Sequence, residues 1–237
     1  MGKLEVLREE ALKKGVPAPD VERWLSTARR RVTLLTTGDG PVVGQAGGHP
    51  ILPVDAPDIQ WPFVFSLDCA AIPRQATDIP LPPDGHLLFF TQSDDFGPDL
   101  NGEVMYVPAG IPVVERTSLP DDFPRSDLYL SIVPSMPDEG PDQPEHPYLN
   151  ELKDVWTEKK DDIIRDGPIR IGGYPDEIQI NPVEQAEEED PGKEWILLAE
   201  WDTPVWSGAL GIVHWVIPRE DLAARRFDQV RISLDIV

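Results

Sequence analysis

One order of short motifs occurs twice in this chain, and this duplication is the strongest constraint on its fold. The tetrapeptide Gly-Gly-His-Pro at 47–50 returns 125 positions later as Gly-Gly-Tyr-Pro at 172–175. Each copy continues with a Trp-led apolar segment that ends in Asp and then a Gly-led apolar segment: 61–68 and 85–90 in the first copy, 195–202 and 211–216 in the second. Because motif order is kept while loop lengths differ, we predict two related halves whose strands are constrained and whose connections are not.

Proline and glycine indicate which class of fold the halves adopt. Proline occurs 27 times in 237 residues, about twice its usual share, and a proline inside a helix costs about 3 kcal/mol. Long helices must therefore be few. Each Gly-Gly-x-Pro predicts a tight turn in which glycine supplies a positive φ and proline fixes the exit. We predict an α+β fold dominated by β structure, with an internally duplicated, antiparallel, roll-like β core, N-terminal helices and one mid-chain helix.

Local patterns place the elements of this fold. Apolar periodicity predicts helices at 3–14, at 20–30 with Asp20 as N-cap and a basic C-terminal end at 29–31, and at 147–165. The acidic stretch 184–190 is predicted to be a loop, and Gly-Asp-Gly at 38–40 a hairpin turn. Short apolar runs between turn signals predict strands at 32–37, 61–67, 86–91, 103–107, 112–114, 128–133, 195–201, 211–217 and 230–236.

The same patterns suggest how the chain is organised. Residues 1–31 are expected to form a helical segment packed on the body. Residues 32–237 are expected to form a single domain of two related halves, about 32–133 and 168–237. A proline-rich loop and a helix would join the halves, because 134–147 contains five prolines.

Charge is unevenly distributed along the chain. Residues 1–31 carry eight basic and five acidic residues, a net of +3, whereas the remaining 13 basic and 38 acidic residues give −25. Between 32 and 115 the only basic residue is Arg74, against eleven acids. Such a body repels phosphate backbones, so nucleic acid is not an expected partner. The acidity indicates either solubility and a high-salt habit or an acidic face that docks a basic protein.

Cysteine content and hydropathy bear on the compartment. Cys69 is the only cysteine and lies in an apolar setting, which excludes a disulfide framework and favours an inert buried thiol. The N-terminus lacks the apolar core of a signal peptide, and no run of eighteen uncharged apolar residues exists. We expect a cytoplasmic protein with no membrane partner.

The sequence contains no recognisable catalytic or metal motif. The four histidines show no metal spacing, and nucleophile elbows, phosphate loops and dinucleotide fingerprints are absent. A site shared by His86 and His214 remains an alternative to structural roles for both. We expect no cofactor, no metal and no enzyme. The candidate binding residues are His49 in its glycine-rich turn, its counterpart Tyr174, the loop residue Trp206, and the strand-end pair Asp68 and Asp202.

The duplicated motifs resemble the YwqG-like family, a bacterial domain family of unassigned function. The resemblance covers roughly 32–236: Gly-Gly-x-Pro-x-Leu-Pro at 47–53, Trp-Pro at 61–62, Leu-Asp at 67–68, and the corresponding motifs of the second half. The sequence departs from the family pattern at 206–208, where a Trp-Gly-Asp-like turn is usual. The resemblance implies a β-rich, roll-like fold with a duplicated core and implies no catalytic residues. Relatives are often considered immunity or toxin-associated proteins in bacterial conflict.

Three functions follow as hypotheses. The first is a non-enzymatic bacterial protein that binds a basic protein partner, immunity-like or toxin-associated. The second is a small-ligand-binding module with a groove between the halves, lined by His49, Tyr174 and Trp206. The third is a carboxylate-dependent hydrolase, which requires Asp68 and Asp202 within about 10 Å of each other.

Overall fold

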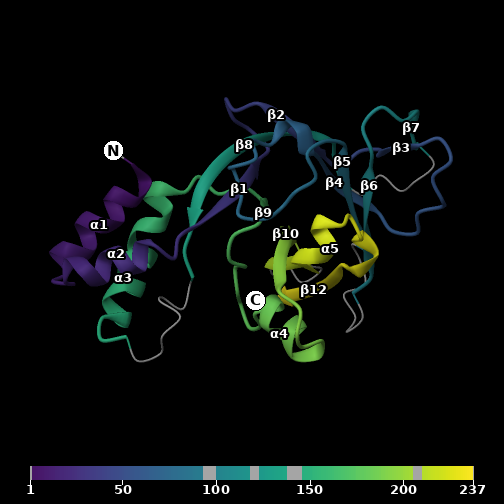
Figure 1. Cartoon of the computed structure of the whole chain (residues 1–237). Coiled ribbons are helices and arrows are strands. Elements are labelled where there is room, and N and C mark those ends of the chain that lie inside the picture. Colours follow the sequence, from purple (N-terminus) through teal and green to yellow (C-terminus); the bar gives the residue numbers. More distant parts are fainter. Residues whose placement is uncertain (1, 93–99, 118–122, 138–145, 205–209, 237) are drawn as a thin grey trace.

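The computed structural model describes residues 2–92, 100–117, 123–137, 146–204 and 210–236. Three helices gather on one side of a large curved sheet, and a small two-stranded sheet lies at the opposite side (Figure 1). The helices are α1 (Lys3–Lys13), α2 (Ala18–Leu25), α3 (Leu149–Ile163), α4 (Pro182–Glu189) and α5 (Arg219–Ala223), with 3-10 turns η1 (Cys69–Ala71) and η2 (Phe227–Gln229).

The described strands confirm the predicted β-dominated α+β fold. Ten of them form one antiparallel sheet in the order β12-β11-β10-β9-β1-β8-β2-β4-β5-β6, and β3 pairs with β7. The strands are β1 (Arg29–Leu35), β2 (Val42–Ala46), β3 (Ile51–Pro53), β4 (Phe63–Asp68), β5 (His86–Thr91), β6 (Gly102–Val107), β7 (Val113–Glu115), β8 (Ser126–Ser135), β9 (Ile169–Ile171), β10 (Trp195–Pro204), β11 (Leu210–Pro218) and β12 (Arg231–Ile236).

The strand order is symmetric about the antiparallel β1–β8 pair at its centre. On one side follow β9, β10, β11 and β12, and on the other side follow their counterparts β2, β4, β5 and β6. Each repeat therefore begins with a strand, β1 or β8, that pairs with the second strand of the other repeat: β1 with β9, and β8 with β2. The duplicated core is thus built with exchanged first strands.

Strand register shows that the two halves match residue by residue. A β-bulge interrupts the β4–β5 ladder at Val64, and a bulge interrupts the β10–β11 ladder at Leu198, 134 positions later. The carbonyl of each bulged residue accepts a hydrogen bond from the first glycine of its own turn: Gly47 donates to Val64 at 2.8 Å, and Gly172 to Leu198 at 3.4 Å. All four turn glycines have positive φ, between 56° and 79°, as predicted. Residues related by this register are called equivalent below.

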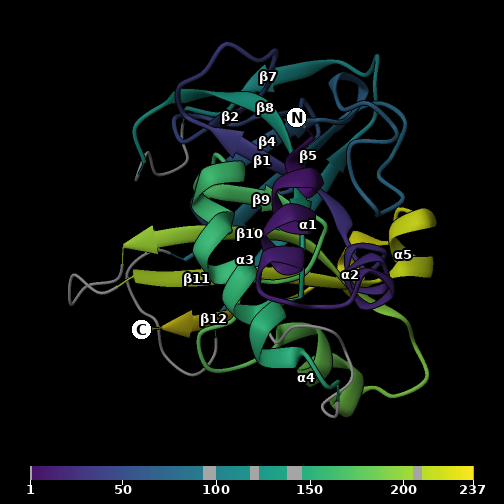
Figure 2. The same cartoon turned by 90° about the vertical axis from the view of Figure 1, so that its left-hand side faces the viewer.

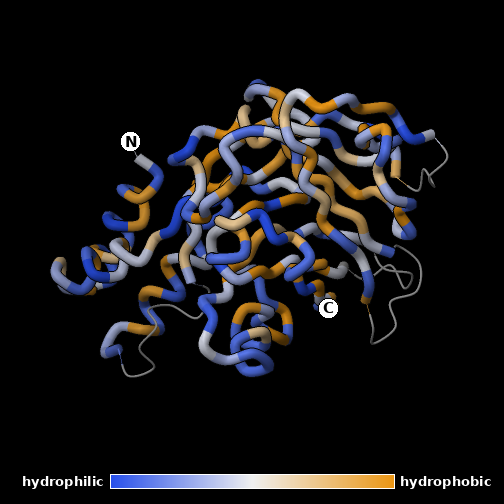
Figure 3. The backbone as a smooth tube through the Cα atoms, turned by 45° about the vertical axis from the view of Figure 1, so that its right-hand side comes forward, coloured by the Kyte–Doolittle hydropathy of each residue, from blue (hydrophilic) through white to orange (hydrophobic). Residues whose placement is uncertain are grey.

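The main core lies between the two halves and draws on both. Phe65 and Phe89 stack with centroids 4.1 Å apart, and Trp215 of the second half meets both rings edge-on. All three side chains are fully buried. Apolar segments of the strands converge on this interior (Figure 3), so neither half has a separate main core.

The helical layer forms a second core. In Figure 2, α1 and α3 lie side by side with α2 beside them, and their shared interior includes Leu7, Trp24 and Leu152. None of the helices described has the length and apolarity that crossing a bilayer requires. Helix α2 begins at Ala18 after an extended Pro17, so the predicted N-cap role of Asp20 was wrong.

Three other local predictions were also wrong. The basic run 29–31 opens strand β1 instead of closing a helix, because it continues into the β-branched and apolar residues of that strand. The acidic stretch after residue 181 is helix α4, since Asn181 caps Val183 and Glu184 and Pro182 takes the first helical position. The turn at 38–40 joins β1 and β2, which are not hydrogen-bonded to each other because β8 lies between them.

Different elements cover the outer faces of the two halves. Over the first half, β3 and β7 close a small core that contains Leu52, Phe63 and Phe90. Over the second half, α4 packs Ala186 against Trp195 and neighbouring strand residues. The equivalent faces of the sheet therefore lie in different surroundings.

Candidate functional site

Equivalent positions on the two outer faces carry different chemistry. Alternate residues of β4 and β10, such as Phe65 and Trp201, face the main core, so the residues between them face outward. The outward rows that lie in register across three strands are Gln45, Ser66 and Leu88 in the first half, and Arg170, Glu200 and His214 in the second.

In the second half this row is the centre of a buried ion network. Arg170 binds Asp202 through two nitrogens, at 2.6 and 2.8 Å, and its Nε donates to Glu200. Arg31 donates to Asp176 at 2.9 Å and to Glu200 at 3.3 Å. Glu200 is fully buried, and Arg31 and Arg170 are 3 % and 2 % exposed. Charges this deep need partners: Arg170 contacts carboxylates through all three of its guanidinium nitrogens, whereas Arg31 contacts Asp176 and Glu200 through Nη1.

Burial and charge shift the titrations in this network. Complete burial raises the pKa of Glu200 to about 7, although Arg170 opposes the shift. Burial opposes ionisation of Asp176, but Arg31 and Arg170 together hold its pKa below the ordinary value. Burial lowers the pKa of His214 to about 4, so His214 is neutral at pH 7 and its Nε2 donates to the carbonyl of Asp176 at 3.0 Å. Within this network, Asp176, Glu200 and Asp202 are each paired with at least one arginine.

In the first half the equivalent face is open and forms a cavity of about 370 Å³, here called the β3–β7 cavity. It lies between the outer face of β2, β4 and β5 and the two-stranded β3–β7 sheet. Its walls are mainly apolar and include Val42, Ile51, Phe63, Leu88, Val107 and Val113, while its polar side chains are Gln45, His49, Ser66, Asp68 and His86. A concave apolar site with a few convergent polar groups is typical of ligand pockets.

Local structure fixes the polar groups of the β3–β7 cavity. The Gln45 amide donates to the carbonyls of Gly47 and His49 and so holds the glycine turn beside the cavity. Asp68 ends β4, is in register with His86, and accepts a hydrogen bond from the Ala70 amide at 3.0 Å. The Nδ1 atom of His49 is buried and has no hydrogen-bond partner in the described part of the chain. The cavity thus offers one carboxylate and two imidazoles against an apolar wall.

The predicted site residues divide between the two halves. His49 and Asp68 line the β3–β7 cavity together. Tyr174, which is equivalent to His49, instead donates to the Thr27 carbonyl and lies 4.0 Å beneath the Arg29 guanidinium. Trp206 lies outside the described residues. His49 and Tyr174 therefore do not line one groove between the halves.

The predicted aspartate pair and the predicted histidine pair also separate. Asp202 is held by Arg170 in the ion network, whereas Asp68 caps η1 in the other half. His86 is an exposed cavity residue, but His214 is 1 % exposed in the network, so a cleft shared by both histidines was a wrong alternative. Within the described residues, no group of three His, Cys, Asp or Glu is arranged to hold a metal ion.

Sequence reasoning missed some residues of the cavity and predicted the state of Cys69. Gln45, Ser66 and His86 were not among the candidate binding residues. Ser66 lies two positions before Asp68 on β4 and His86 is in register with Asp68, so strand alternation was the signal that could have placed Ser66 on the face of Asp68. Cys69 is buried as predicted, and its burial, together with Asp68, raises the pKa of the thiol to about 12.

A family model for a domain of unknown function, DUF1963, matches residues 44–235. The chain belongs to the DUF1963 family. The match starts in β2 and ends in β12, so the DUF1963 domain contains both glycine turns, both bulges and most of the β3–β7 cavity. Helices α1 and α2 and strand β1, which brings Arg31 into the ion network, precede the matched residues. No curated protein matches the chain.

Proposed function

We propose that this DUF1963 protein is a binding protein that docks a basic segment of a partner protein at the β3–β7 cavity. The observation that carries the proposal is an open, mainly apolar cavity with Asp68 in its lining, at a position where the equivalent face of the other half is filled by ion pairs. The acidity of the chain supports a basic partner, because complementary charge speeds encounter and selects partners.

Exposed apolar side chains surround the mouth of the cavity. Val42, Ile51 and Val113 line it and are still 45–51 % exposed. Val54, Ile111 and Val114, which lie in or next to β3 and β7, are also exposed. Apolar residues gathered on one small surface sheet are typical of an interaction site. They support a partner that inserts an apolar side chain and covers the β3–β7 sheet.

Charge around the cavity supports the basic character of that partner. The segments that build it, 42–68, 86–91 and 102–115, contain no lysine or arginine, and their carboxylates are Asp55, Asp58, Asp68, Glu103 and Glu115. Two arginines lie beside them: Arg116 donates to the carbonyls of Pro53, Val54 and Ala56, and Arg125 lies 3.9 Å from Glu115. Lysine or arginine beside the inserted apolar residue would meet the remaining carboxylates. Such rim pairs contribute mainly to association rate and specificity.

The finer identity of the partner extends this proposal. The YwqG-like resemblance supports a partner of the toxin class, to which this protein would be an immunity-like or toxin-associated counterpart. A small ligand in the same cavity is the second candidate, and the partnerless Nδ1 of His49 supports it. A hydrolase is not proposed, since Asp68 and Asp202 are bound in different halves.

A library of displayed random peptides tests the proposal with matched variants. We expect selected peptides to carry an apolar residue next to lysine or arginine. The double variant D55K/D58K should weaken their binding at least about tenfold. The control E187K/E188K changes the net charge by the same amount on exposed positions of α4 and should leave binding unchanged.

An apolar pair of variants completes the test. Val113→Ser should weaken peptide binding, whereas Leu12→Ser, which alters an equally exposed side chain on α1, should not. The proposal fails if no basic peptides are selected, or if both members of either pair lose binding equally. The second candidate would be favoured if no peptide binds and a small molecule raises the Tm of the wild type but not that of the Leu88→Trp variant, in which the larger side chain fills the cavity.

A further inference from the structure

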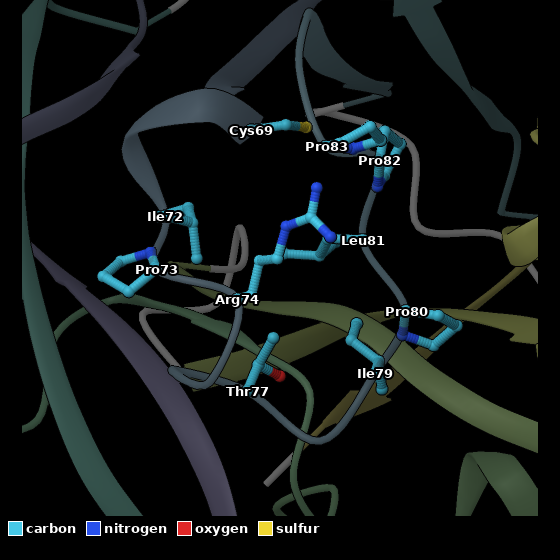
Figure 4. Close-up of a pocket in the computed structure, with 10 residues that line it drawn as sticks. All are labelled: Cys69, Ile72, Pro73, Arg74, Thr77, Ile79, Pro80, Leu81, Pro82 and Pro83. Atoms are coloured by element: carbon cyan, nitrogen blue, oxygen red, sulfur yellow. The ribbon is translucent and has the colours of Figure 1, made fainter.

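A second cavity of about 350 Å³ lies within the connection between β4 and β5. It is lined entirely by residues of the segment 69–83, which is rich in proline. In Figure 4 the side chain of Arg74 extends into the space between Cys69, Leu81 and Pro82, with its guanidinium toward the centre. The wall is otherwise apolar apart from the Cys69 thiol and Thr77.

Arg74 is an exposed residue, and its guanidinium makes no hydrogen bond or ion pair within the described part of the chain. Thr77, in contrast, is already within reach of the Ile171 carbonyl and Asp78. Cys69 is a neutral thiol and cannot balance the charge. Asp68 and Asp84, the carboxylates that help to raise the pKa of this thiol, form no ion pair with Arg74 within the described part of the chain.

Further cations lie beside this cavity. Pro73 also lines an adjacent groove of about 660 Å³, which is bordered by Lys3, Arg29 and Arg30. Arg30 donates to the carbonyl of Gln75 at 2.8 Å, so its guanidinium lies next to the Arg74 segment. Asp78 lies 3.8 Å from Arg29, and it also accepts a hydrogen bond from the Gly173 amide. A protein with net charge −22 therefore presents a local cluster of basic residues at this loop.

We propose that the Arg74 cavity binds a small carboxylate with an apolar body. The planar guanidinium of arginine matches a carboxylate with two parallel hydrogen bonds. The prolines, Ile72 and Leu81 would contact an aliphatic or aromatic body, and the volume is within the range of small-molecule pockets. This site is separate from the β3–β7 cavity and does not depend on the function proposed there.

Titration calorimetry and amide NMR with octanoate test the proposal on the full chain. Octanoate should bind and shift amide signals of residues 69–83, while octanol and octylammonium, which lack the carboxylate, should bind more weakly. Arg74→Gln should reduce the affinity for octanoate about 10- to 100-fold. Arg23→Gln removes one positive charge from an exposed position on α2 and should have no effect.

Each outcome decides the proposal. Weakened binding in Arg74→Gln alone supports it, and Arg74→Lys should then recover only part of the affinity because it keeps the charge without the fork. No saturable binding below about 10 mM octanoate overturns the proposal. Equal binding by Arg74→Gln, or octanol binding as tightly as octanoate, overturns it as well.

Discussion

Glu200→Ser is the sharpest test of the ion network, because serine is the residue at the equivalent position 66. Glu200 is fully buried and accepts hydrogen bonds from Arg170 Nε, Arg31 Nη1 and the Asp176 amide. A serine hydroxyl is too short to replace all three contacts. Arg31 keeps Asp176 and the Tyr174 carbonyl, but the other two donors lose this acceptor in a buried site.

The expected cost follows from these contacts. A buried donor left without an acceptor costs about 1–3 kcal/mol, and breaking a buried ion pair about 3–5 kcal/mol. We therefore expect Glu200→Ser to lower the free energy of unfolding by about 3–5 kcal/mol. For a chain of this length, the change corresponds to a fall in Tm of roughly 10 °C. Ser66→Ala, at the equivalent open position, should cost less than about 1 kcal/mol.

Urea unfolding followed by circular dichroism measures both variants, together with Arg170→Gln and the double variant. The double variant restores the Gln45–Ser66 pair of the first half at the equivalent positions of the second. Its cost should be smaller than the sum of the single costs by at least about 1 kcal/mol. A loss below about 1 kcal/mol for Glu200→Ser, or strictly additive single variants, would refute the view that this network is a coupled unit.

Three further predictions concern single residues. The folded pKa of His214 lies below its ordinary value of 6.5, so the unfolded chain takes up the proton first as the pH falls. The free energy of unfolding of the wild type, relative to His214→Leu, should therefore fall by about 2–3 kcal/mol between pH 7 and pH 4. A difference in urea unfolding that does not change with pH would contradict this. Gly47→Ala should lower the free energy of unfolding clearly more than Gly110→Ala, for which we expect a loss of about 1 kcal/mol. Both glycines have positive φ, but a Cβ at Gly47 would lie 2.3 Å from the Phe123 carbonyl oxygen, whereas a Cβ at Gly110 would have no neighbour within 4 Å. Equal losses in thermal unfolding would contradict the close approach at Gly47. Cys69 should react with iodoacetamide at pH 8 only upon unfolding, since it is buried and its thiol stays protonated; fast labelling of the folded protein would contradict this.

Strands with a complete local signal could be predicted from the sequence. The run 86–91 is β5 to the residue, because apolar β-formers lie between a glycine turn and a polar segment. The predicted strand-end pair Asp68 and Asp202 proved equivalent in register, although β10 continues past Asp202 to Pro204. The short strands β2, β3 and β9 were missed, since each has five residues or fewer and depends on its neighbours.

The site was harder to predict because its properties depend on three-dimensional neighbours. Nothing local distinguishes Asp68 from Asp202, yet Arg170 and Arg31 occupy one face and Gln45 leaves the other open. The exchange of first strands was also hidden, because sequence order suggests that β1 pairs with β2. Charge composition was compatible with solubility in high salt or with a basic partner, and it gave no position for such a partner.

The pairing of β1 with β9 and of β8 with β2 has a consequence for any attempt to divide this protein. One repeat by itself, such as residues 29–117, would expose the edge of β2 where β8 normally lies and would leave its own β1 without β9. Two such chains could satisfy each other by trading those strands, which is the geometry of a domain-swapped dimer. The 237-residue chain therefore has the form of such a dimer covalently joined into one polypeptide. Cleavage in the connection between β7 and β8 should give two fragments that stay associated and unfold together.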